Sequence, residues 1–252
     1  MLKVRIIPIL LYKNYGLVKG VSFDSNRRIG DALQFVRVYN IREVDELIFL
    51  DINATNELRS PDFDTIDDLA DECFMPFTVG GGIRSIEDVR KLLMIGADKV
   101  AINTAAIEKP GIIKEASCHF GSQCIVVSID FMIKENNNYE VFKRSGTEPT
   151  GLSPLDLAKR AEELGAGEIL LTSIDRDGTM KGYELECIRT VCEAVSIPVI
   201  ASGGCGNYND MYEALIEGQA SAIAASSIFS FTDQTPKEAK KYLYQKGIPV
   251  RL

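Results

Sequence analysis

Short apolar runs alternate with longer amphipathic segments along the whole chain. The apolar runs cover residues 4–11, 46–52, 77–79, 98–102, 124–130, 168–174, 197–201 and 221–225. Most are apolar at consecutive positions, which is typical of parallel strands buried on both faces. Helical spacing of apolar residues is found near 31–43, 63–73, 85–95, 109–119, 154–164, 184–195, 208–217 and 236–246. Roughly eight strand–helix units fit a (β/α)8 barrel and also a doubly wound open sheet.

Residues that start and stop helices support these helical segments. Ser85 and Ser153 are suited to cap helix N-termini, because a serine hydroxyl can accept a hydrogen bond from a free backbone amide. Three glycines follow helical segments, where a left-handed residue is often needed: Gly96, Gly165 and Gly218.

An internal repeat decides between the two folds. The repeated segments are Phe77–Gly82 with Val199–Gly204, Glu46–Leu50 with Glu168–Thr172, and Ala97–Ala101 with Ala220–Ala224. The first two pairs lie 122 residues apart and the third lies 123 residues apart. This order indicates two fused half-barrels, which a closed (β/α)8 TIM barrel with an internal two-fold repeat accommodates. No linker separates the halves, so residues 1–252 are predicted to form a single domain.

Composition and charge exclude several classes of function. The chain has 28 basic and 36 acidic residues, a balance that argues against binding to nucleic acid. Its single histidine, His119, rules out a multi-histidine metal site and disfavours a histidine triad, so we expect no metal and no cofactor. Catalysis is therefore expected to depend on carboxylates and lysines.

The cysteines and the apolar runs indicate the compartment. The six cysteines contain no CxxC pair and no disulfide-framework spacing. No apolar run approaches the ~18 residues of a membrane span, and no secretory leader is recognisable. The sequence predicts a reduced, soluble, cytoplasmic protein that does not enter a membrane.

Each half carries a glycine-rich strand end and, after the next strand, a small polar turn. The residues are Gly81, Gly82, Asn103 and Thr104 in the first half and Gly203, Gly204, Ala225 and Ser226 in the second. Glycines let backbone amides approach a phosphate closely, and barrel ligands bind at the C-terminal ends of the strands. The pairing predicts two phosphate sites on opposite sides of the barrel mouth, rather than tight turns alone.

One carboxylate stands out as an acid–base candidate, and its expected partner is missing. Asp130 ends the fifth strand, after an apolar run that would partly desolvate it. The repeat places Leu11 at the corresponding position of the first strand, 119 residues earlier. Leucine cannot transfer a proton. For Asp175, after the sixth strand, we expect a role as a loop anchor.

Four charged residues stand near strand starts: Arg5, Glu46, Lys99 and Glu168. Side chains at strand starts face the bottom of a barrel, which usually serves stability. Four inward charges of alternating sign would form a ring of ion pairs. This ring is either a structural plug or a gate through which a small molecule enters.

These residues make a family resemblance recognisable. Over essentially its whole length, the chain resembles the cyclase subunit of imidazole glycerol phosphate synthase, a (β/α)8 barrel. The segments that carry the resemblance are Phe77–Ile83, Ala97–Ala106, Gly121–Gln123, Gly165–Thr179 and Ile200–Gly204. The resemblance implies that a glutaminase docks on the barrel base and that ammonia enters through a gate formed by Arg5, Glu46, Lys99 and Glu168. Ammonia would then react with a bisphosphorylated ribulosyl aminoimidazole carboxamide nucleotide, giving imidazole glycerol phosphate and aminoimidazole carboxamide ribotide.

The same resemblance assigns roles to residues at the mouth. It implies phosphate contacts at Gly82, Asn103, Thr104, Asp177, Gly178, Gly204, Ala225 and Ser226. Lys19 matches a lysine of the first loop, residues 12–30, and Asp51 is retained. Of the two catalytic aspartates, Asp130 matches one and Leu11 replaces the other.

The replacement at Leu11 favours a different role within the same family. The segment Leu10–Gly20 is more similar to a paralogous branch associated with amidation of surface-polysaccharide sugars. That branch implies an ammonia relay to a separate sugar amidotransferase, for acetamido-to-acetamidino conversion. The alternatives are a genuine cyclase of histidine biosynthesis and, disfavoured by the four-residue gate, the related phosphoribosyl isomerase. Residues 131–150 are predicted to form a hairpin of unassigned role.

Overall fold

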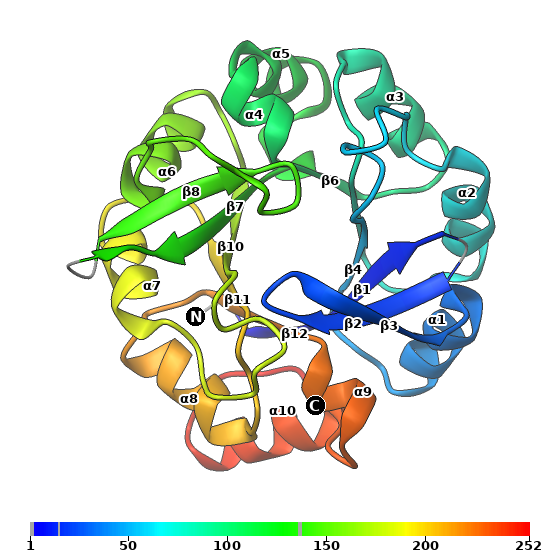
Figure 1. Ribbon diagram of the computed structural model, residues 1–252. Helices are drawn as coiled ribbons and strands as arrows, with labels where there is room; N and C mark the ends of the chain where they lie inside the picture. The colour runs from blue at the N-terminus through cyan, green and yellow to red at the C-terminus, as the bar shows by residue number, and fades with distance from the viewer. Residues whose placement is uncertain (1–2, 15, 136–137) are drawn as a thin grey trace.

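The computed structural model describes residues 3–14, 16–135 and 138–252, in which eight parallel strands close into a barrel (Figure 1). The strands are β1 (Arg5–Lys13), β4 (Leu47–Asp51), β5 (Phe77–Gly80), β6 (Lys99–Ile102), β7 (Ile125–Ile133), β10 (Glu168–Ser173), β11 (Val199–Ser202) and β12 (Ala222–Ala225). Each strand pairs in parallel with the next, and β12 pairs with β1. The predicted (β/α)8 barrel is confirmed, and the open sheet is excluded.

An outer ring of helices surrounds the strands (Figure 1). The predicted helices are α1 (Ala32–Ile41), α2 (Phe63–Glu72), α3 (Ile86–Met94), α5 (Gly111–Phe120), α6 (Pro154–Glu163), α7 (Leu185–Cys192), α8 (Tyr208–Ile216) and α10 (Pro236–Gln245). The structure adds short helices that the hydrophobic pattern did not predict: α4 (Thr104–Glu108), α9 (Ser227–Phe231) and the 3-10 turn η1 (Ser122–Cys124). These are too short to show a helical period.

The helix ends follow the expected chemistry with one exception. The Ser85 hydroxyl accepts from the backbone amide of Asp88 in a reciprocal capping box, and Ser153 caps α6. Gly96 and Gly165 have positive φ angles of 106° and 94°. The prediction for Gly218 is wrong, because the left-handed residue is Gln219 (φ 58°). A Cβ at Gly218 would lie 2.6 Å from the Ala214 carbonyl oxygen, so glycine is needed there for close packing.

Two hairpins extend over the barrel mouth from opposite sides (Figure 1). The first continues from β1 into β2 (Gly16–Val21) and β3 (Asp24–Gly30), so the first loop is largely an antiparallel hairpin. The second continues from β7 into β8 (Tyr139–Lys143) and β9 (Glu148–Pro149). This confirms the hairpin predicted over 131–150, of which 136–137 lie outside the described residues. Each half therefore carries a hairpin after its first strand.

The sheet register confirms the two-fold repeat at the level of single residues. Leu11 is the parallel partner of Leu50, and Asp130 is the parallel partner of Thr172. Leu50 and Thr172 are themselves repeat equivalents, 122 residues apart. Leu11 therefore occupies the position in the first half that Asp130 occupies in the second.

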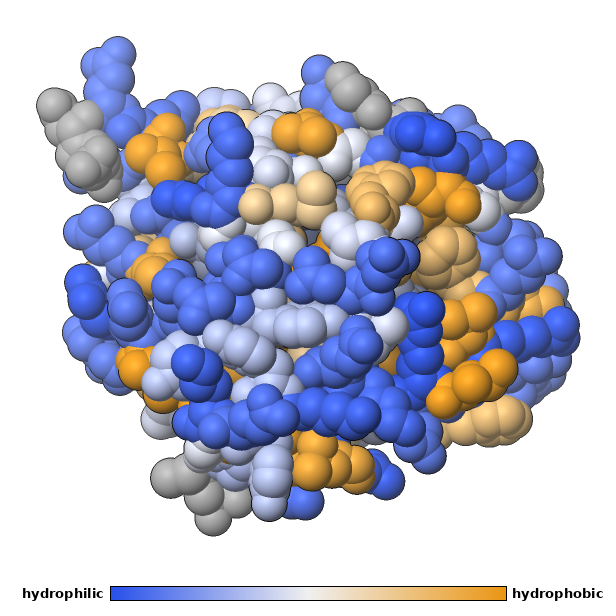
Figure 2. Space-filling view, turned by 90° about the horizontal axis from the view of Figure 1, so that it is seen from below, coloured by the Kyte–Doolittle hydropathy of each residue, from blue (hydrophilic) through white to orange (hydrophobic). Residues whose placement is uncertain are grey.

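The barrel interior below the mouth is apolar, with Ile7, Ile48, Val126, Leu170 and Ile200 all fully buried. Polar side chains cover most of the face shown in Figure 2, and apolar ones gather toward the right, the side on which α1 and α9 lie in Figure 1. Across the described residues, no helix is long and apolar enough to cross a membrane. The six cysteines are free thiols.

Candidate active site

A cavity opens at the C-terminal ends of the strands. It is lined by all the residues predicted to bind ligand: Lys19, Asp51, Gly81, Gly82, Asn103, Thr104, Asp177, Gly178, Gly203, Gly204, Ala225 and Ser226. Asp130 and Leu11 line it as well. Positions spread from the first hairpin to the last strand are thus brought to one hollow, as expected for a barrel of this type.

The glycine turns have the same geometry in both halves. Gly81 and Gly203 have positive φ angles of 105° and 88°. A Cβ at Gly81 would collide with the Asp51 carbonyl oxygen, and a Cβ at Gly203 would lie 2.5 Å from the Ser173 carbonyl oxygen. Only glycine allows this approach, and both turns line the cavity with main chain alone. The two short helices α4 and α9 begin just after Asn103 and Ser226.

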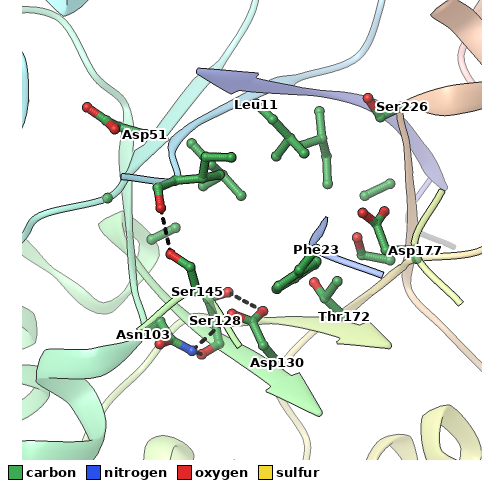
Figure 3. Close-up of a pocket in the computed structure, with 18 of the residues that line it drawn as sticks. Leu11, Phe23, Asp51, Asn103, Ser128, Asp130, Ser145, Thr172, Asp177 and Ser226 are labelled. Atoms are coloured by element: carbon green, nitrogen blue, oxygen red, sulfur yellow. Dashed lines mark hydrogen bonds between the residues drawn. The ribbon is translucent and has the colours of Figure 1, made fainter. Parts of the chain in front are cut away.

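Asp130 lies in a polar pocket on the β7 side of the cavity (Figure 3). Its carboxylate accepts hydrogen bonds from the Asn103 side-chain amide at 3.3 Å and from the Ser128 hydroxyl at 3.4 Å. Desolvation raises the pKa of Asp130 to about 7, the Ser128 hydrogen bond lowers it, and the negative charge of Asp177 raises it. Such a carboxyl can donate or accept a proton near neutral pH.

Leu11 lies across the cavity from Asp130 (Figure 3). Ile9 on the same strand and Leu50 on β4 also line the hollow, so this side of the mouth is aliphatic. The described residues place no second carboxylate at the position equivalent to Asp130. At this level of the cavity the carboxylate therefore lies on the β7 side only.

Lys19 and Asp177, both predicted to contact ligand, are bound to each other. The Lys19 ammonium lies 3.0 Å from both carboxylate oxygens of Asp177. The backbone amide of Ser22 donates to the Asp177 carbonyl at 2.8 Å, and the Ser22 hydroxyl donates to the Asp175 carbonyl at 3.2 Å. These bonds hold the first hairpin against the loop that follows β10.

Asp51 lines the cavity, but its carboxylate points away from the hollow (Figure 3). It makes a bidentate ion pair with Arg59, at 2.6 and 2.8 Å, and accepts from the backbone amides of Asn53 and Ala54. Its side chain therefore orders the loop after β4. Asp175 accepts from the Ile133 amide at 2.7 Å, which supports the loop-anchor role expected for it.

Several cavity residues were not singled out from the sequence. Ser128 and Thr172 are polar side chains beside Asp130, and Phe23 extends from the first hairpin into the hollow (Figure 3). The turn at Gly146 reaches Phe23 from the second hairpin, since a Cβ on Gly146 would lie 3.0 Å from its ring. The repeat already aligns Thr172 with Leu50 and Ser128 with Ile9, and the change from an aliphatic to a polar residue at both positions is the signal that marks them. Nothing in the sequence marks Phe23.

The four charged residues at the opposite end of the barrel form a closed ring of ion pairs. Arg5 contacts Glu46 at 2.6 Å and Glu168 at 3.0 Å, and Lys99 contacts both carboxylates at 3.0 Å. Burial lowers the pKa of Arg5, but the charges of Glu46 and Glu168 outweigh it and raise that pKa. The Thr78 hydroxyl also donates a hydrogen bond to the Glu46 carboxylate, at 2.8 Å. The predicted ring exists as a structural unit.

Other chemistry at the mouth is limited. Cys205 lines the cavity, but desolvation raises its pKa to about 12, so it is a neutral thiol rather than a nucleophile. Among the described residues, no group of three or more His, Cys, Asp or Glu side chains is placed to hold a metal ion.

The chain matches a known protein family. The family model described as "Histidine biosynthesis protein" matches residues 5–233. This span contains every candidate residue from Arg5 at the base to Ser226 at the mouth.

Proposed function

Because the chain belongs to the histidine biosynthesis protein family, we propose that it is the barrel subunit of a glutamine-dependent amidotransferase. In this proposal a glutaminase docks at the base, ammonia enters through the ring of Arg5, Glu46, Lys99 and Glu168, and the barrel passes it toward the mouth. A separate sugar amidotransferase then uses the ammonia for amidination. The protein is expected to act in the cytoplasm.

The observation that carries this proposal is Leu11 at the position equivalent to Asp130. The cyclase reaction of this family is expected to use a carboxylate from each half. Loss of one acid–base group typically costs about 10²–10⁴-fold in rate. This barrel keeps the four charged residues at its base but only one of the two carboxylates at its mouth. That combination suits delivery of ammonia better than the cyclase reaction.

Exposed apolar side chains near the base of the barrel favour the proposed docking of a glutaminase there. Ile41, Phe74 and Met94 are 82%, 84% and 79% exposed. They lie at or just beyond the C-terminal ends of α1, α2 and α3, which face the same end of the barrel as the charged ring. Exposed large apolar side chains at that end are suited to an interface with another subunit.

The second candidate is a genuine imidazole glycerol phosphate synthase cyclase. It is favoured by the retention of Asp130 and of both glycine turns in one cavity. Leu11 opposes it.

The experiment that separates the two supplies the purified protein with the bisphosphorylated ribulosyl nucleotide and a high ammonium concentration at alkaline pH. We expect little imidazole glycerol phosphate from the unaltered chain and an increase of at least about tenfold from Leu11→Asp. Robust product from the unaltered chain would support the cyclase and contradict the relay. Leu11→Asn, which restores polarity without a carboxylate, is the matched control.

A second experiment tests the gate. With its glutaminase and an acceptor enzyme present, Lys99→Glu should impair transfer from glutamine and leave transfer from free ammonium unchanged. Lys114→Glu, a charge reversal at an exposed position of α5, should affect neither reaction. Equal loss of both reactions in Lys99→Glu would indicate a structural plug instead of a gate.

A further inference from the structure

The mouth cavity differs between its two halves in a systematic way. Register and repeat pair Ile9 with Ser128, Leu11 with Asp130, and Leu50 with Thr172. All six side chains line the cavity. At each of the three positions the first half has an aliphatic side chain and the second half has a polar one.

The three aliphatic residues are neighbours of one another, and so are the three polar residues, so the cavity has two distinct walls. Leu11 and Leu50 are direct neighbours on β1 and β4, and Ile9 lies one step deeper on β1. We call these three residues the aliphatic wall. Asp130 and Thr172 are direct neighbours on β7 and β10, and the Ser128 hydroxyl donates to Asp130 at 3.4 Å. These three residues form the polar wall.

The asymmetry is confined to the middle of the mouth. At its edges both halves keep the glycine turns, Gly81–Gly82 and Gly203–Gly204, and a polar residue after the next strand, Asn103 or Ser226. The edges thus remain suited to anionic groups, whereas the middle offers hydrogen bonds on one side only.

We propose that the cavity binds an organic phosphate that carries a small aliphatic group, which packs on Ile9, Leu11 and Leu50 while polar groups of the ligand face Ser128, Asp130 and Thr172. This inference goes beyond the proposed ammonia relay and rests on the two phosphate sites predicted at the barrel mouth. It adds the chemical class of the ligand, which the family match does not specify.

Burial of polar groups decides against a ligand that is hydroxylated along its whole length. Hydroxyls placed against the aliphatic wall would lose water without gaining a hydrogen bond, which disfavours binding. An alkyl or acyl group placed there buries apolar surface, worth roughly fourfold in affinity for each methylene group removed from water.

Binding of simple phosphate esters tests this without a partner protein, ammonia or the natural ligand. Affinities for inorganic phosphate, methyl phosphate and n-butyl phosphate are measured by calorimetry, and the contact is located by NMR of ¹³C-labelled Ile and Leu methyl groups. We expect n-butyl phosphate to bind at least about tenfold more tightly than methyl phosphate. The methyl signals of Ile9, Leu11 and Leu50 should shift with the butyl ester.

Two variants test whether the butyl group contacts Leu11. Leu11→Asn should abolish most of the preference for n-butyl phosphate and leave the affinity for inorganic phosphate unchanged. Leu11→Met, which keeps an aliphatic side chain of similar volume, should retain the preference. Because Leu11 is only half-buried at the cavity wall, both variants should fold, and thermal unfolding verifies this.

The outcomes separate this inference from the proposed function. Equal affinity for the methyl and butyl esters, or a preference that survives Leu11→Asn, would overturn the aliphatic-wall assignment alone. Failure of all three phosphates to bind would contradict the phosphate sites predicted at the mouth, and this inference with them, but would not bear on the proposed ammonia relay.

Discussion

The Lys19 ammonium lies 3.0 Å from both carboxylate oxygens of Asp177, and the Lys19 side chain is almost completely buried. This ion pair joins the first hairpin to the loop after β10, segments that are more than 150 residues apart in sequence. Both residues also line the cavity, so the pair fixes the first hairpin at the cavity wall.

Replacing Lys19 by methionine should loosen the first hairpin. Methionine keeps most of the aliphatic stem, but it removes the charge that pairs with Asp177. Amide hydrogen exchange in Gly16–Val21 should accelerate by about tenfold or more, with little change in the barrel strands. Arg27→Met, at an exposed position of the same hairpin, is the control. Unchanged exchange in Lys19→Met would show that other contacts hold the hairpin.

Asp130 should make stability fall as pH rises from about 4 to about 7. Below that window its carboxyl is protonated in the folded and the unfolded chain, so it imposes no penalty. Within the window Asp130 ionises in the unfolded chain but stays protonated in the folded chain, because burial raises its folded-state pKa. Above the window it is ionised in both, and the loss of folding free energy has reached its full value.

Asp130→Asn removes this titration. We expect the variant to be more stable than the unaltered protein at pH 8, by about 1–3 kcal/mol, and nearly equal to it at pH 4. Urea unfolding at several pH values measures the difference. A gain that is the same at every pH would rule out the titration of Asp130 as its cause.

The two glutamates of the basal ring should differ in their contribution to stability. Glu46 is 1% exposed and contacts Arg5, Lys99 and Thr78, so Glu46→Gln removes the more deeply buried of the two carboxylates that Arg5 and Lys99 share. We expect a loss of about 3 kcal/mol in the free energy of unfolding. Glu168→Gln, at a more exposed position, should cost about half as much. Chemical denaturation measures both, and equal losses would argue against burial as the cause.

Glycine at position 203 should be required by the backbone. Gly203→Ala would place a Cβ 2.5 Å from the Ser173 carbonyl oxygen at a φ of 88°, and we expect a loss of about 2–4 kcal/mol. Gly111→Ala is the matched control, because nothing lies within 4 Å of its Cβ and helix α5 begins there. This control should be neutral or slightly stabilising. Thermal unfolding compares the two, and tolerance of Gly203→Ala would show that the turn can rearrange.

The barrel and the composition of its mouth could be predicted because both leave local or repeated signals. Buried parallel strands are continuous apolar runs, and the repeat places equivalent glycines such as Gly81 and Gly203 at equivalent strand ends. The repeat also identified Leu11 as the equivalent of Asp130, and the sheet register agrees.

The pairing of side chains at the mouth, unlike that of the basal ring, could not be predicted, because it depends on distances that no local pattern encodes. Asp51 and Asp177 are both carboxylates near strand ends, yet one binds Arg59 and the other binds Lys19. The strands of the first hairpin were also missed. Their sequence mixes glycine, lysine and arginine with apolar residues, and their order depends on pairing with β1 rather than on alternation.

The equivalent strand positions are separated by different lengths of chain. Leu11 and Leu50 are 39 residues apart, whereas Asp130 and Thr172 are 42 residues apart, and both form the same parallel pair. The hairpin segments above the mouth therefore tolerate insertion without shifting the sheet or the ionic ring beneath it. The hairpins that border the mouth can therefore change in length and sequence while the ion pairs at the opposite end keep their geometry, so the two ends of the barrel can evolve independently.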